Sequence, residues 1–164
     1  MTKKGFSIIE ILVVVGVFAT IAVISTQAIV TSLKSARKAE ASIQVKENLN
    51  YAISVMERKL RNAREISSCT QTFIQYIDAE GKSASFRCIN VGGNNGRVVN
   101  EIETERLTSS EIAVTDCRFI CEPGTENVPP SVNINLQAVN ADSEMASEDK
   151  SSVSVSTRVY LRVY

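Results

Sequence analysis

The hydrophobic and polar positions along this chain of 164 residues change pattern twice. From Ile11 to Leu33 the sequence carries no charged residue and is mostly apolar. These 23 residues span about 34 Å as an α-helix, which is long enough to cross a bilayer with some tilt. We therefore expect a membrane-spanning helix near the start of the chain.

From Lys34 onward the pattern becomes amphipathic. Apolar side chains recur at three- and four-residue spacing and form one stripe, made of Val45, Leu49, Ala52, Met56, Leu60 and Ala63. No proline occurs before Pro123. The pattern predicts one continuous helix from about Ser7 to about Ile66, apolar all round in its first half and packed on one side in its second. Such a helix would be about 90 Å long and would act as a spine.

The remaining sequence reads as strands. Thr70–Tyr76 and Ser83–Ile89 flank a turn at residues 78–81 and predict a hairpin. Further strands are expected at Arg97–Ile102, Glu111–Ile120, Ser131–Val139 and Val153–Val163, with a glycine loop at 92–96 and an acidic, mobile segment at 141–151. The last two strands alternate apolar and polar residues, which is typical of strands with one exposed face. The predicted fold class is α+β, with a long N-terminal helical spine packed on a small antiparallel β-sheet head.

The four cysteines all lie after the helix, which suits a compartment that permits disulfides. If residues 79 and 80 form the hairpin tip, Cys69 and Cys88 lie nearly opposite each other. We therefore favour Cys69–Cys88 together with Cys117–Cys121, although crossed pairings remain open. The second pair needs a bulge or a turn, because four extended residues span about 13 Å. Cys117 and Cys121 also have the spacing of zinc ligands, but the other two cysteines are dispersed, which argues against a zinc site.

Charge narrows the possible chemistry. Residues 67–164 hold 8 Lys/Arg against 13 Asp/Glu, a net charge of −5, which argues against binding nucleic acid through its phosphates. The chain has no histidine, the usual general base. The acidic group Glu101, Glu103, Glu105 and Glu111 could bind calcium, but we interpret it as a solvated face because it lacks a loop with alternating oxygen ligands. We expect no enzymatic activity, no cofactor and no metal.

The residues before the apolar segment are Lys3 and Lys4, followed by Gly5-Phe6-Ser7-Ile8-Ile9-Glu10. The lysines place the N-terminus in the cytoplasm by the positive-inside rule. An ionised carboxylate in lipid costs at least about 2.5 kcal/mol, so such a residue usually has a function and a partner. Two plainer interpretations are an ordinary signal anchor and a secretory signal cleaved after Thr20-Ile21-Ala22. The apolar segment continues past that point to Val30, which favours an anchor.

This combination resembles the prepilin-type N-terminus shared by type IV pilins, type II secretion pseudopilins and competence pilins. The resemblance implies that prepilin peptidase cleaves between Gly5 and Phe6 and methylates the new amine. It also implies that Glu10 neutralises the amine of Phe6 on a neighbouring subunit during filament assembly. The chain then divides into a leader at 1–5, a transmembrane and assembly half-helix at 6–33, an amphipathic half-helix at 34–66 and a β-rich head at 67–164.

The partners implied by the resemblance are other pilin or pseudopilin subunits, prepilin peptidase, an inner-membrane assembly platform and, before assembly, membrane lipid. The expected location is the inner membrane, crossed once with the head outside the cytoplasm, and then a pilus or pseudopilus. The missing helix proline and the absence of a single C-terminal disulfide loop favour a minor subunit. The alternatives are a ligand-binding head, in an adhesin or DNA-uptake pilin, and an anchored surface protein that does not polymerise.

Overall fold

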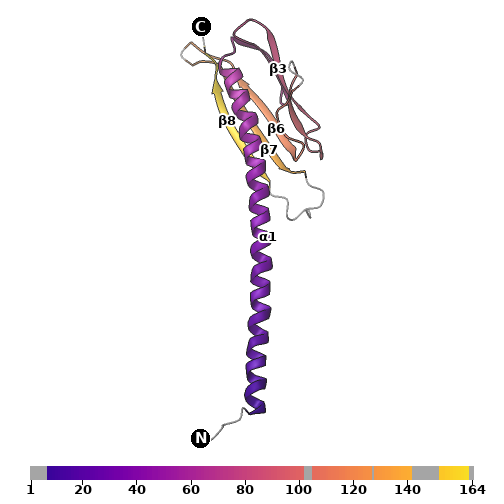
Figure 1. Ribbon diagram of the computed structural model, residues 1–164. Helices are drawn as coiled ribbons and strands as arrows, with labels where there is room; N and C mark the ends of the chain where they lie inside the picture. Colours follow the sequence, from indigo (N-terminus) through magenta and orange to yellow (C-terminus); the bar gives the residue numbers. More distant parts are fainter. Residues whose placement is uncertain (1–6, 102–104, 127, 142–151, 163–164) are drawn as a thin grey trace. The chain divides into compact units, whose positions relative to one another are not determined.

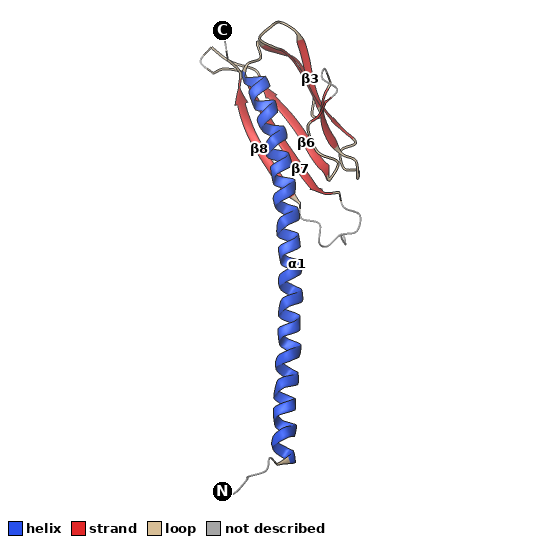
Figure 2. Cartoon of the chain, viewed as in Figure 1, coloured by secondary structure: helices blue, strands red, loops and turns tan. Residues whose placement is uncertain are grey.

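The computed structural model describes residues 7–101, 105–126, 128–141 and 152–162 (Figures 1 and 2). One long helix, α1, spans Ile8–Arg61. Eight strands follow it, namely β1 Glu65–Cys69, β2 Phe73–Ile77, β3 Ser83–Ile89, β4 Arg97–Asn100, β5 Glu105–Arg106, β6 Ile112–Glu122, β7 Ser131–Asn140 and β8 Val153–Tyr160. The predicted α+β class with a long N-terminal helix is confirmed.

Helix α1 begins and ends with identifiable backbone contacts. The carbonyl of Ser7 accepts hydrogen bonds from the N–H groups of Glu10 and Ile11, at 3.0 and 3.3 Å. The helix ends at Arg61, five residues before the predicted end at Ile66. The following chain is strand instead, because the N–H of Arg64 donates to the carbonyl of Ile77 at 2.8 Å and the backbone joins a sheet. Pairing with β2 therefore overrides the helical pattern.

The chain separates into two compact units, residues 1–39 and residues 40–164, and each is described by itself. In the first unit, every described residue from Ser7 to Ala39 is exposed. Among the described residues, α1 is the one helix long and apolar enough to cross a membrane. The second unit holds the rest of α1 and all eight strands.

The strands of the second unit form two antiparallel sheets, where the pattern predicted one small sheet. The five-stranded sheet has the order β1-β2-β3-β4-β5, and the three-stranded sheet has the order β6-β7-β8. The predicted hairpin is confirmed as β2 paired with β3. Its turn is closed by Asp78, whose Oδ1 accepts the N–H of Lys82 at 2.7 Å, and by Gly81 with a φ of 81°.

One core holds the second unit together. The predicted helical stripe is buried, and Val45, Leu49, Ala52, Met56, Leu60 and Ala63 are all fully inaccessible to solvent. They join apolar residues of both sheets, including Ile74, Tyr76, Phe86, Val98, Ile134 and Leu136. Figure 1 shows the C-terminal part of α1 lying along the three-stranded sheet. Burying one such Leu contributes about 1.5–3 kcal/mol, so the stripe fixes this part of the helix to the head.

The two sheets are joined where the glycine loop meets β6. The N–H of Val114 donates to the carbonyl of Gly96 at 2.9 Å, and the N–H of Gly92 donates to the carbonyl of Val114 at 3.2 Å. A Cβ at Gly96 would lie 2.0 Å from the carbonyl oxygen of Val114. Only glycine fits this contact, because any side chain would push the two backbones apart.

The disulfides link the two sheets, and the pairing we favoured from the sequence is wrong. The bonds are Cys69–Cys121 and Cys88–Cys117, each with a Cα–Cα distance of 6.4 Å. Cys69 and Cys88 do not meet because the chain reverses after Cys69, where the N–H of Thr70 donates to the carbonyl of Phe73. Cys69 therefore lies on β1 and Cys88 on β3, with β2 between them. Two strand spacings amount to about 10 Å, beyond the reach of a disulfide.

Cys117 and Cys121 do not meet because both lie in the continuous strand β6. The expected bulge falls earlier, between Val114 and Asp116, so the three residues between Cys117 and Cys121 stay extended. Each cysteine bonds instead to the five-stranded sheet. All four sulfurs are thereby used, which removes them as zinc ligands.

Candidate functional site

The first candidate site is the exposed apolar part of α1. Its large side chains are half to four-fifths exposed, from Ile8 at 80% to Leu33 at 57%. Glu10 stands in the first turn and is the one charged residue between Ile8 and Leu33. Monomeric soluble proteins rarely expose continuous apolar surface of this extent. This segment therefore requires an apolar environment supplied from outside the chain.

The processing residues Gly5 and Phe6 lie outside the described residues, as do Lys3 and Lys4. Glu10 is described, is exposed, and lies within the first helical turn after Ser7. The proposed contact between Glu10 and the amine of Phe6 therefore stays a prediction.

The acidic group of the head is dispersed among different contacts. Glu101 accepts a hydrogen bond from Ser85 at 2.9 Å and forms a close ion pair with Arg87. The hydrogen bond with Arg87 is the main cause that lowers the pKa of Glu101 below its ordinary value of 4.5. Glu111 instead accepts from Gln44 at 2.5 Å, and Glu103 lies outside the described residues. Within the described part of the chain, no group of three or more acidic, cysteine or histidine residues could hold a metal ion.

The outer face of the five-stranded sheet carries a second feature. Arg87 stacks over the ring of Phe73, with 4.5 Å between its guanidinium carbon and the ring centroid. An open hollow of about 600 Å³ lies beside it, lined by Ile89, Arg97, Val99, Asn100, Glu101 and Arg106. Residues 102–104, which follow Glu101 in sequence, lie outside the described residues.

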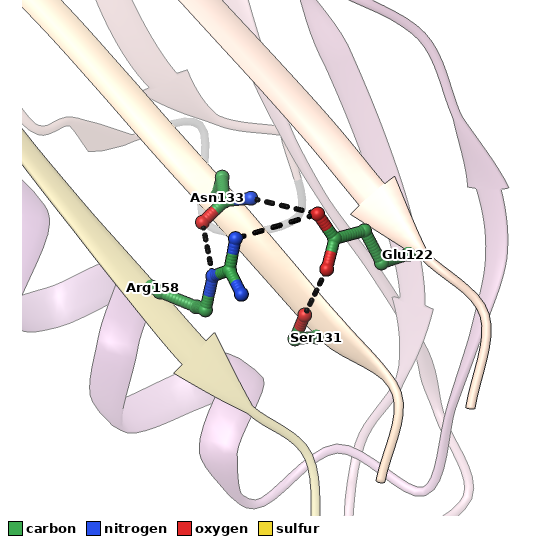
Figure 3. Close-up of polar contacts among 4 residues, drawn as sticks. All are labelled: Glu122, Ser131, Asn133 and Arg158. Carbon is green, nitrogen blue, oxygen red and sulfur yellow. Dashed lines mark hydrogen bonds and ion pairs between the residues drawn. The ribbon is translucent and has the colours of Figure 1, made fainter. Parts of the chain in front are cut away.

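The outer face of the three-stranded sheet holds a polar network (Figure 3). Nε of Arg158 donates to Oδ1 of Asn133 at 2.8 Å, and its Nη2 donates to Oε1 of Glu122 at 3.4 Å. Asn133 also donates to Oε1 of Glu122 at 3.3 Å, and the hydroxyl of Ser131 donates to Oε2 at 3.2 Å. Three strands thus supply one connected set of side chains, with the planar groups of Arg158 and Asn133 held in place.

Charge within this network is balanced. A hydrogen bond with Tyr160 and the charge of Glu122 both raise the pKa of Arg158 above its ordinary value. The other cation on this face, Arg118, lies 3.8 Å from a carboxylate oxygen of Asp116. Both arginines therefore have a carboxylate partner among the described residues of this face.

The sequence reasoning did not single out this polar face. The sequence does contain an indication of it. Residues 131–139 alternate apolar and polar side chains, and Asn133, Asn135 and Gln137 occupy the positions between buried apolar residues. The register that brings Arg158 beside Asn133 and Ile120 depends on strand pairing between β6, β7 and β8. That pairing cannot be read from any one strand.

Comparison of the chain with protein-family models, with curated proteins and with solved structures gave no match. The architecture, a long apolar N-terminal helix followed by a small antiparallel β head, is nevertheless pilin-like.

Proposed function

We propose that this chain is a structural subunit of a type IV pilus, a type II secretion pseudopilus or a competence pseudopilus. Prepilin peptidase processes it between Gly5 and Phe6, and it assembles through its N-terminal helix. The observation that carries the proposal is the exposed apolar stretch Ile8–Leu33 with Glu10 as its one charge. An anchor alone would need the apolar length but would gain nothing from a carboxylate at that depth.

The second half of α1 supports the same function. Its apolar stripe is buried in the head, while Ile43 and Tyr51 stay 57% and 55% exposed on the opposite side. A helix that is held to its own head on one side and apolar on another can serve as a spine between subunits. Assembly would then place the first half among neighbouring helices, with Glu10 paired to the amine of Phe6 on one of them.

We further propose a minor subunit. The chain has no proline before Pro123, whereas major pilins often carry one within the helix. Its two disulfides join the two sheets through β6 and do not enclose one C-terminal loop. Both features differ from the usual major subunit.

The first test measures the intact mass and the N-terminal sequence of the chain after co-expression with a prepilin peptidase. We expect a mature form that begins at Phe6 and carries one added methyl group. A Gly5→Val variant, with a bulkier residue at the cleaved bond, should stay uncleaved and serves as the control. A chain that begins at Met1, or near Val23, would overturn the proposal.

The second test separates filament assembly from simple anchoring. A Glu10→Ala variant should still be cleaved and held in the membrane but should enter filaments poorly when it is co-expressed with its assembly system. Loss of the carboxylate removes the partner of the Phe6 amine while the apolar length is unchanged. Unaltered assembly of this variant would favour a membrane-anchored protein that does not polymerise.

A further inference from the structure

The outer face of the three-stranded sheet has a side-chain chemistry that strand formation does not explain. The outward positions of β7 include Asn133, Asn135 and Gln137, and those of β8 include Ser154 and Ser156. Asn is depleted in strands, whereas Thr, Val and Tyr are favoured there. A sheet face selected only for strand formation would favour Thr over Asn at such positions. The run of amides and hydroxyls therefore indicates a second role for this face.

The same face is hollowed. An open depression of about 320 Å³ is lined by Ile120, Asn133, Asn135, Ser156, Thr157 and Arg158. Ile120, Asn133 and Arg158 form one row across the three strands, and the short side chains of Asn135 and Ser156 lie in the next row. Small-molecule sites combine such a concave surface with a few well-placed polar groups.

Some polar side chains around the depression form hydrogen bonds within the chain, and others do not. Asn133 and Arg158 are held by Glu122 in the network of Figure 3. Asn135 and Ser156, in contrast, have no side-chain hydrogen bond within the part of the chain that the structure describes. One amide and one hydroxyl are thus available to a ligand, next to two planar groups of fixed orientation. Together they offer both donors and acceptors.

Charge and backbone bonding limit the class of ligand. Among the described residues of this face, Arg158 is paired with Glu122 and Arg118 with Asp116, so neither arginine offers an uncompensated charge to an anion. β7 is the central strand, so its backbone groups already bond to both neighbours. A peptide cannot add to the ladder at this face and would need a sheet edge. What remains is a neutral ligand recognised by side chains through many hydroxyl groups.

Exposed apolar side chains border the depression. Ile120 and Tyr160 are 44% and 48% exposed, and both occupy outward positions of the same sheet. Hexose rings present hydroxyls at their edges and C–H groups on their faces, which match such a mixture of amides and apolar surface. We propose that the outer face of the three-stranded sheet binds a neutral oligosaccharide, with Asn135 and Ser156 bonding directly to its hydroxyls and Asn133 and Arg158 positioned beside them.

The experiment uses the full chain in phosphatidylcholine nanodiscs, because maltoside or glucoside detergents would compete with a sugar ligand. The probes are fluorescent cellohexaose, maltohexaose, chitohexaose and mannohexaose, and an oligogalacturonate of the same length serves as the anionic probe. We expect at least one neutral hexaose to bind with a Kd of about 1 mM or tighter. We expect an Asn135→Thr variant to bind that hexaose at least about tenfold more weakly.

The substitution and its control are matched. Thr favours strand structure, so Asn135→Thr removes the amide while preserving β7, and circular dichroism checks the fold. Gln75→Thr removes an amide from the outer side of the five-stranded sheet and should leave hexaose binding unchanged. Failure of every neutral hexaose to bind at about 1 mM would overturn the inference, as would binding of oligogalacturonate alone or equal binding by Asn135→Thr.

This inference does not depend on the proposed filament function. A chain that is cleaved at Gly5 and assembled but binds no neutral hexaose would overturn the inference alone. A chain that binds a hexaose but is not cleaved by prepilin peptidase would overturn the proposed function alone.

Discussion

The two halves of α1 are one continuous helix with opposite environments. From Ile8 to Ala39 every described side chain is exposed, although most are apolar. From Ala41 to Leu60 the apolar side chains of one stripe are buried against both sheets. The first half therefore depends on surroundings outside the chain, whereas the second half is stabilised by the chain itself. One continuous helix therefore has two separable roles, contact with external surroundings in the first half and support of the head in the second. A substitution in one half should leave the role of the other half unchanged.

The largest expected effect comes from placing the same charge in each half. Leu49→Arg buries an unpaired cation in the core of residues 40–164 and should prevent stable folding of the head. Val15→Arg should leave the head folded, because Val15 is 59% exposed. It should instead reduce membrane retention, since Arg within the apolar segment costs up to about 2.5–3.5 kcal/mol on insertion, the value at the helix centre. Thermal unfolding and membrane extraction measure the two outcomes. If either variant lowered both the thermal stability of the head and the membrane retention, the two halves of α1 would not be independent.

The disulfides give the next largest effect, confined to the head. Replacing Cys88 and Cys117 together by Ala should lower its free energy of unfolding by about 2–5 kcal/mol, since the link between the sheets is lost. Retention of the apolar half in the membrane should not change.

The same variant also tests the pairing itself. With Cys69–Cys121 intact, intact-mass analysis after thiol alkylation should find no free thiol. Two alkylated cysteines would contradict the Cys69–Cys121 bond and favour one of the other two pairings.

A smaller effect is expected from single hydrogen bonds of the helix. Oδ1 of Asn48 accepts the N–H of Ser109 at 3.2 Å, so Asn48→Ala should destabilise the head by about 1 kcal/mol. The matched change in the first half is Thr26→Ala, whose hydroxyl bonds only to the carbonyl of Ala22 in the same helix at 2.9 Å. Chemical denaturation of the head should not detect that change. Equal destabilisation by the two variants would show that the halves unfold together.

The smallest effect concerns pH. The pKa of Glu101 is lowered by its bond with Arg87, so its ionised form stabilises the folded head above pH 4.5. This stabilisation is lost as the pH falls below 4.5 and through the lowered pKa of the folded state. Glu101→Gln should therefore reduce stability slightly at pH 7 and flatten its fall in acid. Denaturation of both proteins at pH 7 and at pH 3 measures the free energy of unfolding. If the variant lost as much stability between these two pH values as the original chain, Glu101 would not be the group that titrates. The pair is exposed, so the change is small.

Local sequence was sufficient for the helix and for most strands. The stripe through Leu49 and Met56 predicted the buried side of α1, and the pair β2–β3 was predicted with its turn at residues 78–81. The end of α1 was placed too late, because Arg64 and Ile66 suit a helix locally but are paired with β2 in the fold. Strand pairing is a long-range contact, and a helical pattern cannot report it.

Of the candidate sites, the apolar segment and Glu10 could be recognised from the sequence, because each depends on neighbouring residues alone. The network of Glu122, Asn133 and Arg158 could not. Its members are separated by 11 to 36 positions and meet only through the register of three strands. The alternating pattern showed which residues face outward but not which residue lies opposite which.

The sequence by itself determined the long helix, its change from an apolar to an amphipathic half at about Lys34, and the strands with one exposed face, since hydrophobic periodicity follows from local geometry. The tertiary structure alone decided that the head has two sheets, that Cys69 bonds to Cys121 and Cys88 to Cys117, and that a polar hollow forms on the three-stranded sheet. These features depend on which strands become neighbours. That choice is set by burying one shared core, to which distant parts of the chain contribute together.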